Sequence, residues 1–267
     1  MPTTYTHDLF GKEVYKRLPK EVRELIFRYG DLYRIGLHGP DILFYYRCLY
    51  KNKVNQFGVS MHKERARAFF EQGIRTVRDE GDEALLAYLL GFVNHFILDS
   101  EVHPTVERIV DEHGPSHTVQ EKELDRTLML ETGKNPYHYY PSDCIVPKFR
   151  YAWVIHKAIP LVQADKIYAA LRMMKWMTNC MVYDDNGRKQ KILLSLLRVI
   201  GQREKLGDHF MKEYPPEGVQ VYVRELKEHY EEALDKAPAF LEEVYDLARD
   251  HDRPVRLSER FDRTYNG

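Results

Sequence analysis

The sequence predicts an all-α protein, a bundle of many helices. Apolar residues recur at helical spacing in ten segments, whereas the alternation typical of strands is nearly absent. Glycine and proline fall between these segments, where helices are expected to end. The ten predicted helices cover residues 20–27, 42–50, 61–79, 83–101, 118–130, 152–159, 164–182, 189–199, 219–236 and 239–249.

The predicted helix ends follow the positions of residues that break helices. Glycine stops a helix by adopting backbone conformations closed to other residues, and proline lacks the N–H group that a helix interior needs. In chain order, these breaks are Gly30, Gly39-Pro40, Pro104, Gly114-Pro115, Gly133, Pro160, Asn186-Gly187 and Pro215-Pro216.

No linker, composition shift or internal repeat divides the 267 residues, and 43% hydrophobic content is enough for a substantial core. We therefore expect one all-helical domain over residues 1–267. We expect potential metal-binding residues to lie in its N-terminal part, about residues 1–135, which we call the metal-site half, because seven of the twelve histidines fall at or before position 117. A C-terminal helical half, about residues 136–267, completes the domain.

Charge and hydropathy exclude several partners. The 40 basic and 41 acidic residues nearly cancel, so a nucleic-acid partner is unlikely on charge. The first residues carry charges and no apolar core of a signal peptide, which leads us to expect a cytoplasmic protein. The most apolar stretch, 84–98, is too short to span a bilayer and contains Asn94 and His95, so we expect a buried helix and no transmembrane segment.

The most informative pattern is a series of histidines and carboxylates, His95, Asp99, His103, His117 and Glu121. Residues four apart share one face of a helix, so HxxxD and HxxxE each place two potential metal ligands side by side. Imidazole and carboxylate suit zinc, and also manganese or iron, better than calcium. The three widely separated cysteines argue against a cysteine-rich zinc site.

Three further residues have the same chemistry. Asp41 follows the Gly39-Pro40 break, His62 lies in the first turn of its predicted helix, and His7 sits just before the chain becomes helical. Together with the first five, these make eight candidate ligands, enough for two metal ions and part of a third. Two ions about 3.5–4 Å apart would clamp the attacking and leaving oxygens of a phosphoryl group.

Each of these residues also has a purely structural interpretation. His95 and Asp99 could form a buried hydrogen-bonded pair, and Glu121 could close a capping box over residues 118–121. Asp41 after Gly-Pro could cap a helix. Only the joint pattern favours metal binding. The aromatic segments 44–46 and 137–140 are best explained by core packing, with a pocket for a choline-type cation as the alternative.

The ordered set resembles the zinc-dependent phospholipase C family, which is related to the bacterial zinc phospholipases C and, more distantly, to the P1-type nucleases. The resemblance rests on order, residue type and much of the spacing over about residues 5–125. It implies an all-helical fold and hydrolysis of phosphodiester or phosphomonoester bonds at a cluster of three metal ions. The matching residues are His7, Asp41, His62, His95, Asp99, His103, His117 and Glu121.

The resemblance also implies how these residues divide among two to three zinc ions. One ion would be held by Asp41, His62, His95 and Asp99. A second would be held by His103, His117 and Glu121. His7 would contribute to a third, with Asp99 as a bridging carboxylate. This chain lacks the N-terminal Trp that completes the third site in secreted members, and Pro104 is expected to push His103 out of the helix.

The functional hypothesis is a metal-dependent phosphoric ester hydrolase in which metal-bound hydroxide attacks the phosphorus. Asp41 is the candidate catalytic residue, a ligand that also positions or deprotonates the attacking water. The resemblance suggests a phospholipid headgroup as substrate, although a small soluble phosphoester fits equally well. Two alternatives stay open: a P1-type nuclease, and a non-catalytic metal-binding helical protein.

Overall fold

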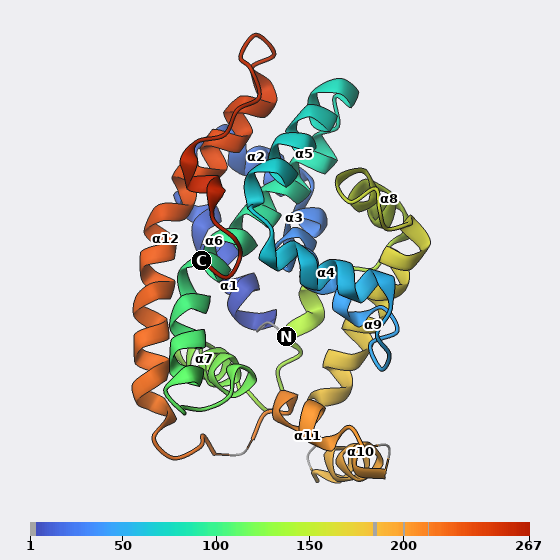
Figure 1. The fold of residues 1–267 in the computed structure, drawn as a ribbon, viewed down its shortest axis with the longest axis vertical. Helices are drawn as coiled ribbons and strands as arrows, with labels where there is room; N and C mark the ends of the chain where they lie inside the picture. The colour runs from blue at the N-terminus through green and yellow to red at the C-terminus, as the bar shows by residue number, and fades with distance from the viewer. Residues whose placement is uncertain (1–3, 184–185, 200, 213) are drawn as a thin grey trace.

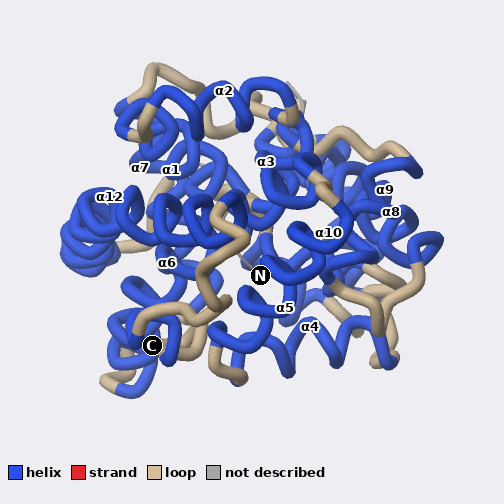
Figure 2. The backbone as a smooth tube through the Cα atoms, turned by 90° about the horizontal axis from the view of Figure 1, so that it is seen from above, coloured by secondary structure: helices blue, strands red, loops and turns tan. Residues whose placement is uncertain are grey.

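The computed structural model describes residues 4–183, 186–199, 201–212 and 214–267. Over these ranges the chain folds into helices joined by loops, with no β-strand (Figures 1 and 2), so the predicted all-α class is confirmed. The elements are α1 (Thr4–Arg17), α2 (Lys20–Arg28), α3 (Gly30–Gly36), the 3-10 helix η1 (Gly39–Tyr45), α4 (Lys53–Lys63), α5 (Ala66–Glu80), α6 (Glu83–Asp111), α7 (His117–Glu131), η2 (Pro141–Cys144), α8 (Phe149–Ala158), α9 (Ala164–Met181), α10 (Arg188–Val199), α11 (Arg203–Leu206), η3 (Gly207–His209), α12 (Val219–Arg249) and η4 (Glu259–Asp262).

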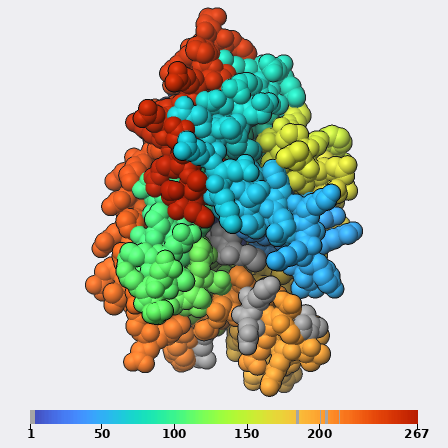
Figure 3. Space-filling model, in the orientation of Figure 1, coloured from blue at the N-terminus to red at the C-terminus, as the bar shows by residue number. Residues whose placement is uncertain are grey.

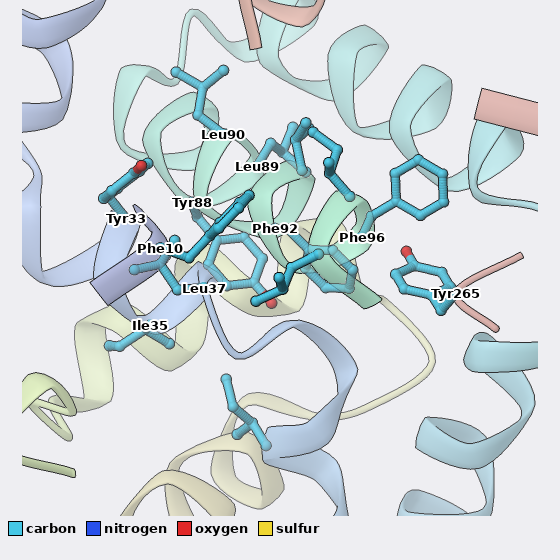
Figure 4. Close-up of a cluster of buried hydrophobic side chains, with 14 of the residues drawn as sticks. Phe10, Tyr33, Ile35, Leu37, Tyr88, Leu89, Leu90, Phe92, Phe96 and Tyr265 are labelled. Carbon is cyan, nitrogen blue, oxygen red and sulfur yellow. The ribbon is translucent and has the colours of Figure 1, made fainter. Parts of the chain in front are cut away.

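The centre of the fold is α6, around which most other helices pack. The Asp82 carboxylate caps its first turn by accepting a hydrogen bond from the Leu85 N–H, 3.0 Å away. Residues 85–100 are buried on every side of the helix, as expected of a helix that is apolar all round. Helices α3, α5 and α12 lie against it, and its aromatic residues Phe92 and Phe96 fill the core between them (Figure 4).

Helix α6 is also long and apolar enough to satisfy the length and composition criteria for a membrane span. It is the one such helix among the residues that the structure describes, and 94% of its most apolar window is buried inside the protein. The prediction of a buried core helix in this region is therefore confirmed.

Helices α3 and α6 approach each other closely through two glycines. A Cβ atom on Gly36 would lie 2.2 Å from the Tyr88 carbonyl oxygen, and one on Gly91 would lie 2.0 Å from that of Tyr33. Backbone carbonyls of two packed helices have no room to move away. The contact matters for the candidate site because α3 leads into η1, which carries Asp41, whereas α6 carries His95, Asp99 and His103.

We predict that Gly91→Ala lowers the free energy of unfolding by roughly 1–3 kcal/mol, because the added methyl group overpacks the α3–α6 contact. Thermal or urea denaturation followed by circular dichroism measures the change. Gly30→Ala is the matched control, since no atom lies within 4 Å of a Cβ built there. Equal stability of the two variants would contradict the proposed contact.

Several predicted helix boundaries were wrong. The predicted helix 61–79 is two helices, α4 and α5, and the predicted α-helix 42–50 is the short 3-10 helix η1 followed by turns. The early start of α4 is explained by Asn52, whose side chain accepts hydrogen bonds from the N–H groups of Val54 and Asn55 and so starts the helix eight residues before position 61.

Two prolines lie inside helices: Pro104, which was a predicted break, and Pro238, which falls between two of the predicted helices. The predicted helices 219–236 and 239–249 are one helix, α12, which passes through Pro238 because Leu234, Ala237 and Leu241 stay buried against the core on both sides of it. Helix α6 likewise passes through Pro104. Proline cannot donate to the carbonyl four residues earlier, that of Ser100, but the Arg263 guanidinium donates to this oxygen instead.

Candidate metal centre

All eight candidate residues come together at one place in the fold. Helix α6 supplies His95, Asp99 and His103 on successive turns of one face, and α7 supplies His117 and Glu121. The predicted HxxxD and HxxxE pairs therefore lie on helices as expected. Three other elements supply one residue each: α1 gives His7, η1 gives Asp41 and α4 gives His62.

The carboxylate of Asp99 lies in the middle of the cluster, with an imidazole on four sides. Its Oδ1 is 3.3 Å from His7 Nε2 and 3.9 Å from His103 Nε2. Its Oδ2 is 3.1 Å from His95 Nε2 and 3.9 Å from His62 Nε2. Because the two oxygens face different imidazoles, one carboxylate can serve two neighbouring ion positions.

The other two carboxylates extend the cluster in opposite directions. Asp41 lies beside His62 and His95, with Oδ1 3.0 Å from His62 Nε2 and Oδ2 3.8 Å from His95 Nε2. Glu121 Oε1 lies 2.9 Å from His117 Nε2 and 3.4 Å from His103 Nε2. Zinc bonds to nitrogen and oxygen are about 2.0–2.2 Å long, so atoms that share one ion lie roughly 3–3.5 Å apart. The shorter distances around Asp99, Asp41 and Glu121, 3.3, 3.1, 3.0 and 3.4 Å, fall in that range, and the 2.9 Å between Glu121 and His117 lies just below it.

The hydrogen-bonding state of these atoms supports a cation at the centre. Buried polar atoms almost always have a hydrogen-bond partner. Here both ring nitrogens of His95 are buried without one among the described residues. The same holds for one oxygen each of Asp41, Asp99 and Glu121. His95 Nε2 and Asp99 Oδ2 are 3.1 Å apart yet form no hydrogen bond, which is the arrangement expected of two ligands aimed at one ion.

The tautomer of His62 points to the same conclusion. Its Nδ1 is 2.8 Å from the Gly58 carbonyl oxygen, which can only accept, so Nδ1 carries the hydrogen. In a neutral ring, Nε2 then presents a lone pair toward the Asp41 carboxylate, 3.0 Å away. Two lone pairs repel at this distance unless a proton or a metal ion lies between them. A backbone carbonyl behind the ring is also the usual support for a metal-binding histidine.

Burial and charge pull the pKa values of these histidines in opposite directions. Burial lowers the pKa of His95 to about 4 despite the nearby carboxylates, so this imidazole is neutral and ready to bind metal. For His103, burial acts in the same direction, but the charges of Asp99 and Glu121 outweigh it and raise the pKa to about 9. The metal-free centre therefore holds a proton at His103 near neutral pH.

Helix α1 is fixed over the cluster by two buried carboxylates. Asp125 of α7 accepts hydrogen bonds from the Thr6 N–H at 2.8 Å and the Thr6 hydroxyl at 2.6 Å, and so caps the first turn of α1 from another helix. The two Asp8 oxygens accept hydrogen bonds from Nε and Nη2 of Arg34, at 2.7 and 2.8 Å, and so tie α1 to α3. These contacts hold His7 between them and beside Asp99.

Gly39 makes room for the ring of His95. Its φ of +45° is a backbone conformation that residues with side chains rarely adopt, and an added Cβ atom would lie 2.2 Å from the imidazole. The Gly39-Pro40 break that helped to predict Asp41 therefore has a second purpose, since it lets η1 pass directly over His95.

Four positional predictions need correction. His7 lies within α1, not before it, and His62 lies in the last turn of α4, not the first turn of its helix. His103 stays on α6 because Arg263 replaces the hydrogen bond that Pro104 cannot make. Glu121 does not close a capping box: α7 begins at His117, and the Glu121 carboxylate faces His117 and His103.

The structure groups the ligand-type atoms somewhat differently from the predicted division. Among the described residues, His7 joins Asp41, His95 and Asp99 in one group, with donor atoms within 4.8 Å of one another. His103, His117 and Glu121 form the second group, as predicted. His7 thus belongs to the first group, whereas His62, which the resemblance assigned to the first ion, lies outside it. The third ion position stays a prediction.

Other residues around the cluster could not be found from motifs. The buried ring of Tyr265 lies 5.5 Å from that of His62 and 5.9 Å from that of His95, and the sequence near the C-terminus gives no sign of this. Two further histidines of the metal-site half are not among the eight candidates. His38 lies 3.3 Å from Cys144 Sγ, and His113 is exposed just after α6. Burial raises the pKa of the Cys144 thiol, so this cysteine is a poor nucleophile despite its histidine neighbour.

The aromatic segments pack mainly against the rest of the protein, as the sequence favoured. Phe44 stacks on the His62 ring at 5.3 Å, and Tyr139 packs edge-on against Tyr5 at 5.2 Å. Phe44 therefore supports a candidate ligand from behind.

Fold and site together define an all-helical protein with a buried histidine and carboxylate centre suited to zinc. The family profile described as zinc dependent phospholipase C matches residues 6–170, more than half of the chain and all eight candidate residues. The chain therefore belongs to the zinc-dependent phospholipase C family, and at the level of that family it is a metal-dependent phosphoesterase. No curated protein and no solved structure gives a significant match.

We predict that Asp99→Asn loses zinc from the group with His7, Asp41 and His95, whereas Glu121→Gln loses zinc only from the group with His103 and His117. Affinity should fall by more than about 100-fold at each affected position, because even residues behind the ligands contribute 10–100-fold. Elemental analysis after dialysis against a weak chelator measures the content. Asp143→Asn, an exposed carboxylate on η2, is the control. Equal zinc content in Asp99→Asn and wild type would refute the central role of Asp99.

Zinc affinity should rise with pH over an unusually wide range. Zinc binds the neutral imidazole, so it must displace the proton of His103, whose pKa is raised to about 9. An ordinary histidine, with a pKa of about 6.5, would stop competing above about pH 7.5. Titration with chelator-buffered zinc at several pH values tests this. We expect affinity to increase up to about pH 9, and a plateau from pH 7.5 onward would contradict the expectation.

Proposed function

We propose that this protein hydrolyses the phosphodiester of phospholipid headgroups at a zinc cluster held by the eight residues described above. The observation that carries the proposal is the buried Asp99 carboxylate, which faces four imidazoles with unpaired ligand atoms around it. Membership of the zinc-dependent phospholipase C family supports a phosphoester substrate. The cytoplasmic location expected from the sequence stays a prediction.

When bound, zinc ions supply a Lewis acid that lowers the pKa of water and offsets negative charge on the phosphoryl oxygens. The protein side chains then orient and move protons. Asp41 is the best placed for this, since Oδ1 faces His62 whereas the buried Oδ2 has no hydrogen-bond partner among the described residues. In the proposed mechanism, Oδ2 accepts a proton from the attacking water and aligns the water oxygen with the phosphorus.

Substrate would enter beside His117. This side chain is 39% exposed, whereas the side chains of the other seven residues are between 0% and 12% exposed. The cluster is thus closed on most sides by α1, η1 and α6 and reaches solvent at the start of α7. Such burial keeps bulk water from the centre and strengthens its electrostatic interactions.

Two alternatives compete with this proposal. A P1-type nuclease would use the same metals on single-stranded nucleic acid, with aromatic side chains stacking on bases. The near balance of charge and the packing of Phe44 against His62 both favour the lipid substrate over this one. A non-catalytic metal-binding protein would keep the ligands without turnover.

A substrate panel tests the proposal directly. We expect the zinc-loaded protein to hydrolyse phosphatidylcholine in mixed micelles and a chromogenic phosphodiester faster than a single-stranded oligonucleotide. Asp41→Asn should lower kcat by about 10²–10⁴, the usual contribution of a general base, and Asp143→Asn should leave kcat unchanged. Preference for the oligonucleotide would establish the nuclease alternative. A folded protein with full zinc content and no turnover of any substrate would establish the non-catalytic one.

A further inference from the structure

Helix α10 is an amphipathic helix that lies on the surface of the protein. Figure 1 places it at one end of the molecule beside α11, and Figure 3 shows the orange atoms of this segment at the lower edge. None of its described residues is buried. Ile192, Leu196 and Val199 are 67%, 55% and 83% exposed, and their spacing of four and three places them in one stripe. A soluble helix would not normally leave such a stripe open to water.

The stripe adjoins an apolar cavity of about 580 Å³. This cavity lies between α9, α10 and the loop after η1, and almost all of its lining side chains are apolar. Its rim carries three more exposed apolar residues, Leu49, Tyr50 and Trp176. Six of the exposed large hydrophobic residues of the described chain thus gather on α10 and this rim.

The charges on this surface have one sign. Within α10, Arg188, Lys191 and Arg198 are exposed, and the helix contains no Asp or Glu. Arg47 adds a further exposed guanidinium at the rim of the cavity. The protein as a whole is nearly neutral, so this concentration of positive charge is local.

We propose that α10 and the rim of the adjoining cavity form a docking surface for an anionic lipid bilayer. A helix with an apolar stripe and only basic charged residues lies in the plane of a membrane interface, with its apolar side chains among the acyl chains. Tyrosine and tryptophan favour the headgroup level, which suits Tyr50 and Trp176. Lysine and arginine add attraction to anionic headgroups. Such docking does not require turnover at the metal centre.

The docking surface is connected to the entrance of the metal centre. Phe210 lines the cavity, and the preceding element η3 packs against α7. The Ser116 hydroxyl, next to His117, lies 3.4 Å from a carboxylate oxygen of Asp208 in η3. A bilayer held at α10 would therefore adjoin the exposed side of the cluster, and a lipid acyl chain would find the apolar cavity beside it.

Vesicle binding of the full-length protein tests this docking. We expect wild type to sediment with vesicles of phosphatidylcholine and phosphatidylglycerol, more weakly with phosphatidylcholine alone, and less as salt rises. Ile192→Asn/Val199→Asn removes apolar contact, and Lys191→Glu/Arg198→Glu reverses charge. Each double variant should weaken binding by at least about tenfold, because each basic charge near an anionic surface contributes about fivefold, a buried apolar side chain contributes at least about as much, and the two changes multiply.

Matched controls and a second readout separate docking from folding and from catalysis. Phe27→Asn/Leu161→Asn and Arg23→Glu/Arg65→Glu change residues of the same kinds, equally exposed, on other surfaces, and should bind vesicles like wild type. All variants should keep wild-type activity on a soluble phosphodiester. A protein that docks but hydrolyses nothing would refute the proposed function and leave the docking surface supported.

Two results would overturn the docking surface itself. One is wild-type protein that binds neither kind of vesicle, or α10 variants that bind as wild type does. The other is that wild-type protein forms dimers, measured by light scattering, and that Ile192→Asn/Val199→Asn abolishes these dimers but leaves vesicle binding unchanged. In that case the stripe is an interface between two copies of the chain.

Discussion

The burial of the Asp99 carboxylate is the constraint on which the rest of the site depends. A charge removed from water needs compensation nearby, or the protein would favour the protonated form. Burial acts to raise the pKa of Asp99, yet the surrounding histidines outweigh it and lower the pKa well below its ordinary value. Each of those histidines comes from a helix that must reach the same point. The position of α1, α4 and α6 relative to one another is therefore part of the metal chemistry.

Contacts from outside the cluster hold these helices in place. Arg263 illustrates the principle, because it donates to the Ser100 carbonyl, forms an ion pair with Glu101 and so keeps α6 helical through Pro104. Without this substitute for the missing proline N–H, His103 would not lie one turn beyond Asp99. A residue far away in the chain thus supports the spacing of two candidate ligands, Asp99 and His103, that are neighbours in sequence. A similar long-range contact, from Asp125 to Thr6, positions His7.

The difference between local and long-range contacts explains how much of the fold and of the candidate site the sequence could predict. Features with a local cause were predicted correctly: the helical class, the buried helix around His95, and the placement of the i to i+4 pairs of candidate ligands on helices α6 and α7. Features with a distant cause were not. The first turn of α1 is held by Asp125 of α7, and no pattern in the sequence links these two segments. Likewise, nothing near Pro104 in the sequence reveals Arg263. The eight residue types could be listed in order, but the grouping of His7 with Asp41 and His95 required the folded chain.

The proposed lipid substrate would account for the placement of the proposed entrance relative to α10. In a bilayer the phosphoester lies at the boundary between water and hydrocarbon, so an enzyme must present an apolar surface and a polar centre side by side. Seven of the eight candidate residues are largely closed off by helices, and the exposed one, His117, adjoins η3. The segment that continues from η3 contributes Phe210 to the apolar cavity. A soluble phosphoester would gain nothing from this proximity, whereas a headgroup still attached to its acyl chains would engage both surfaces at once.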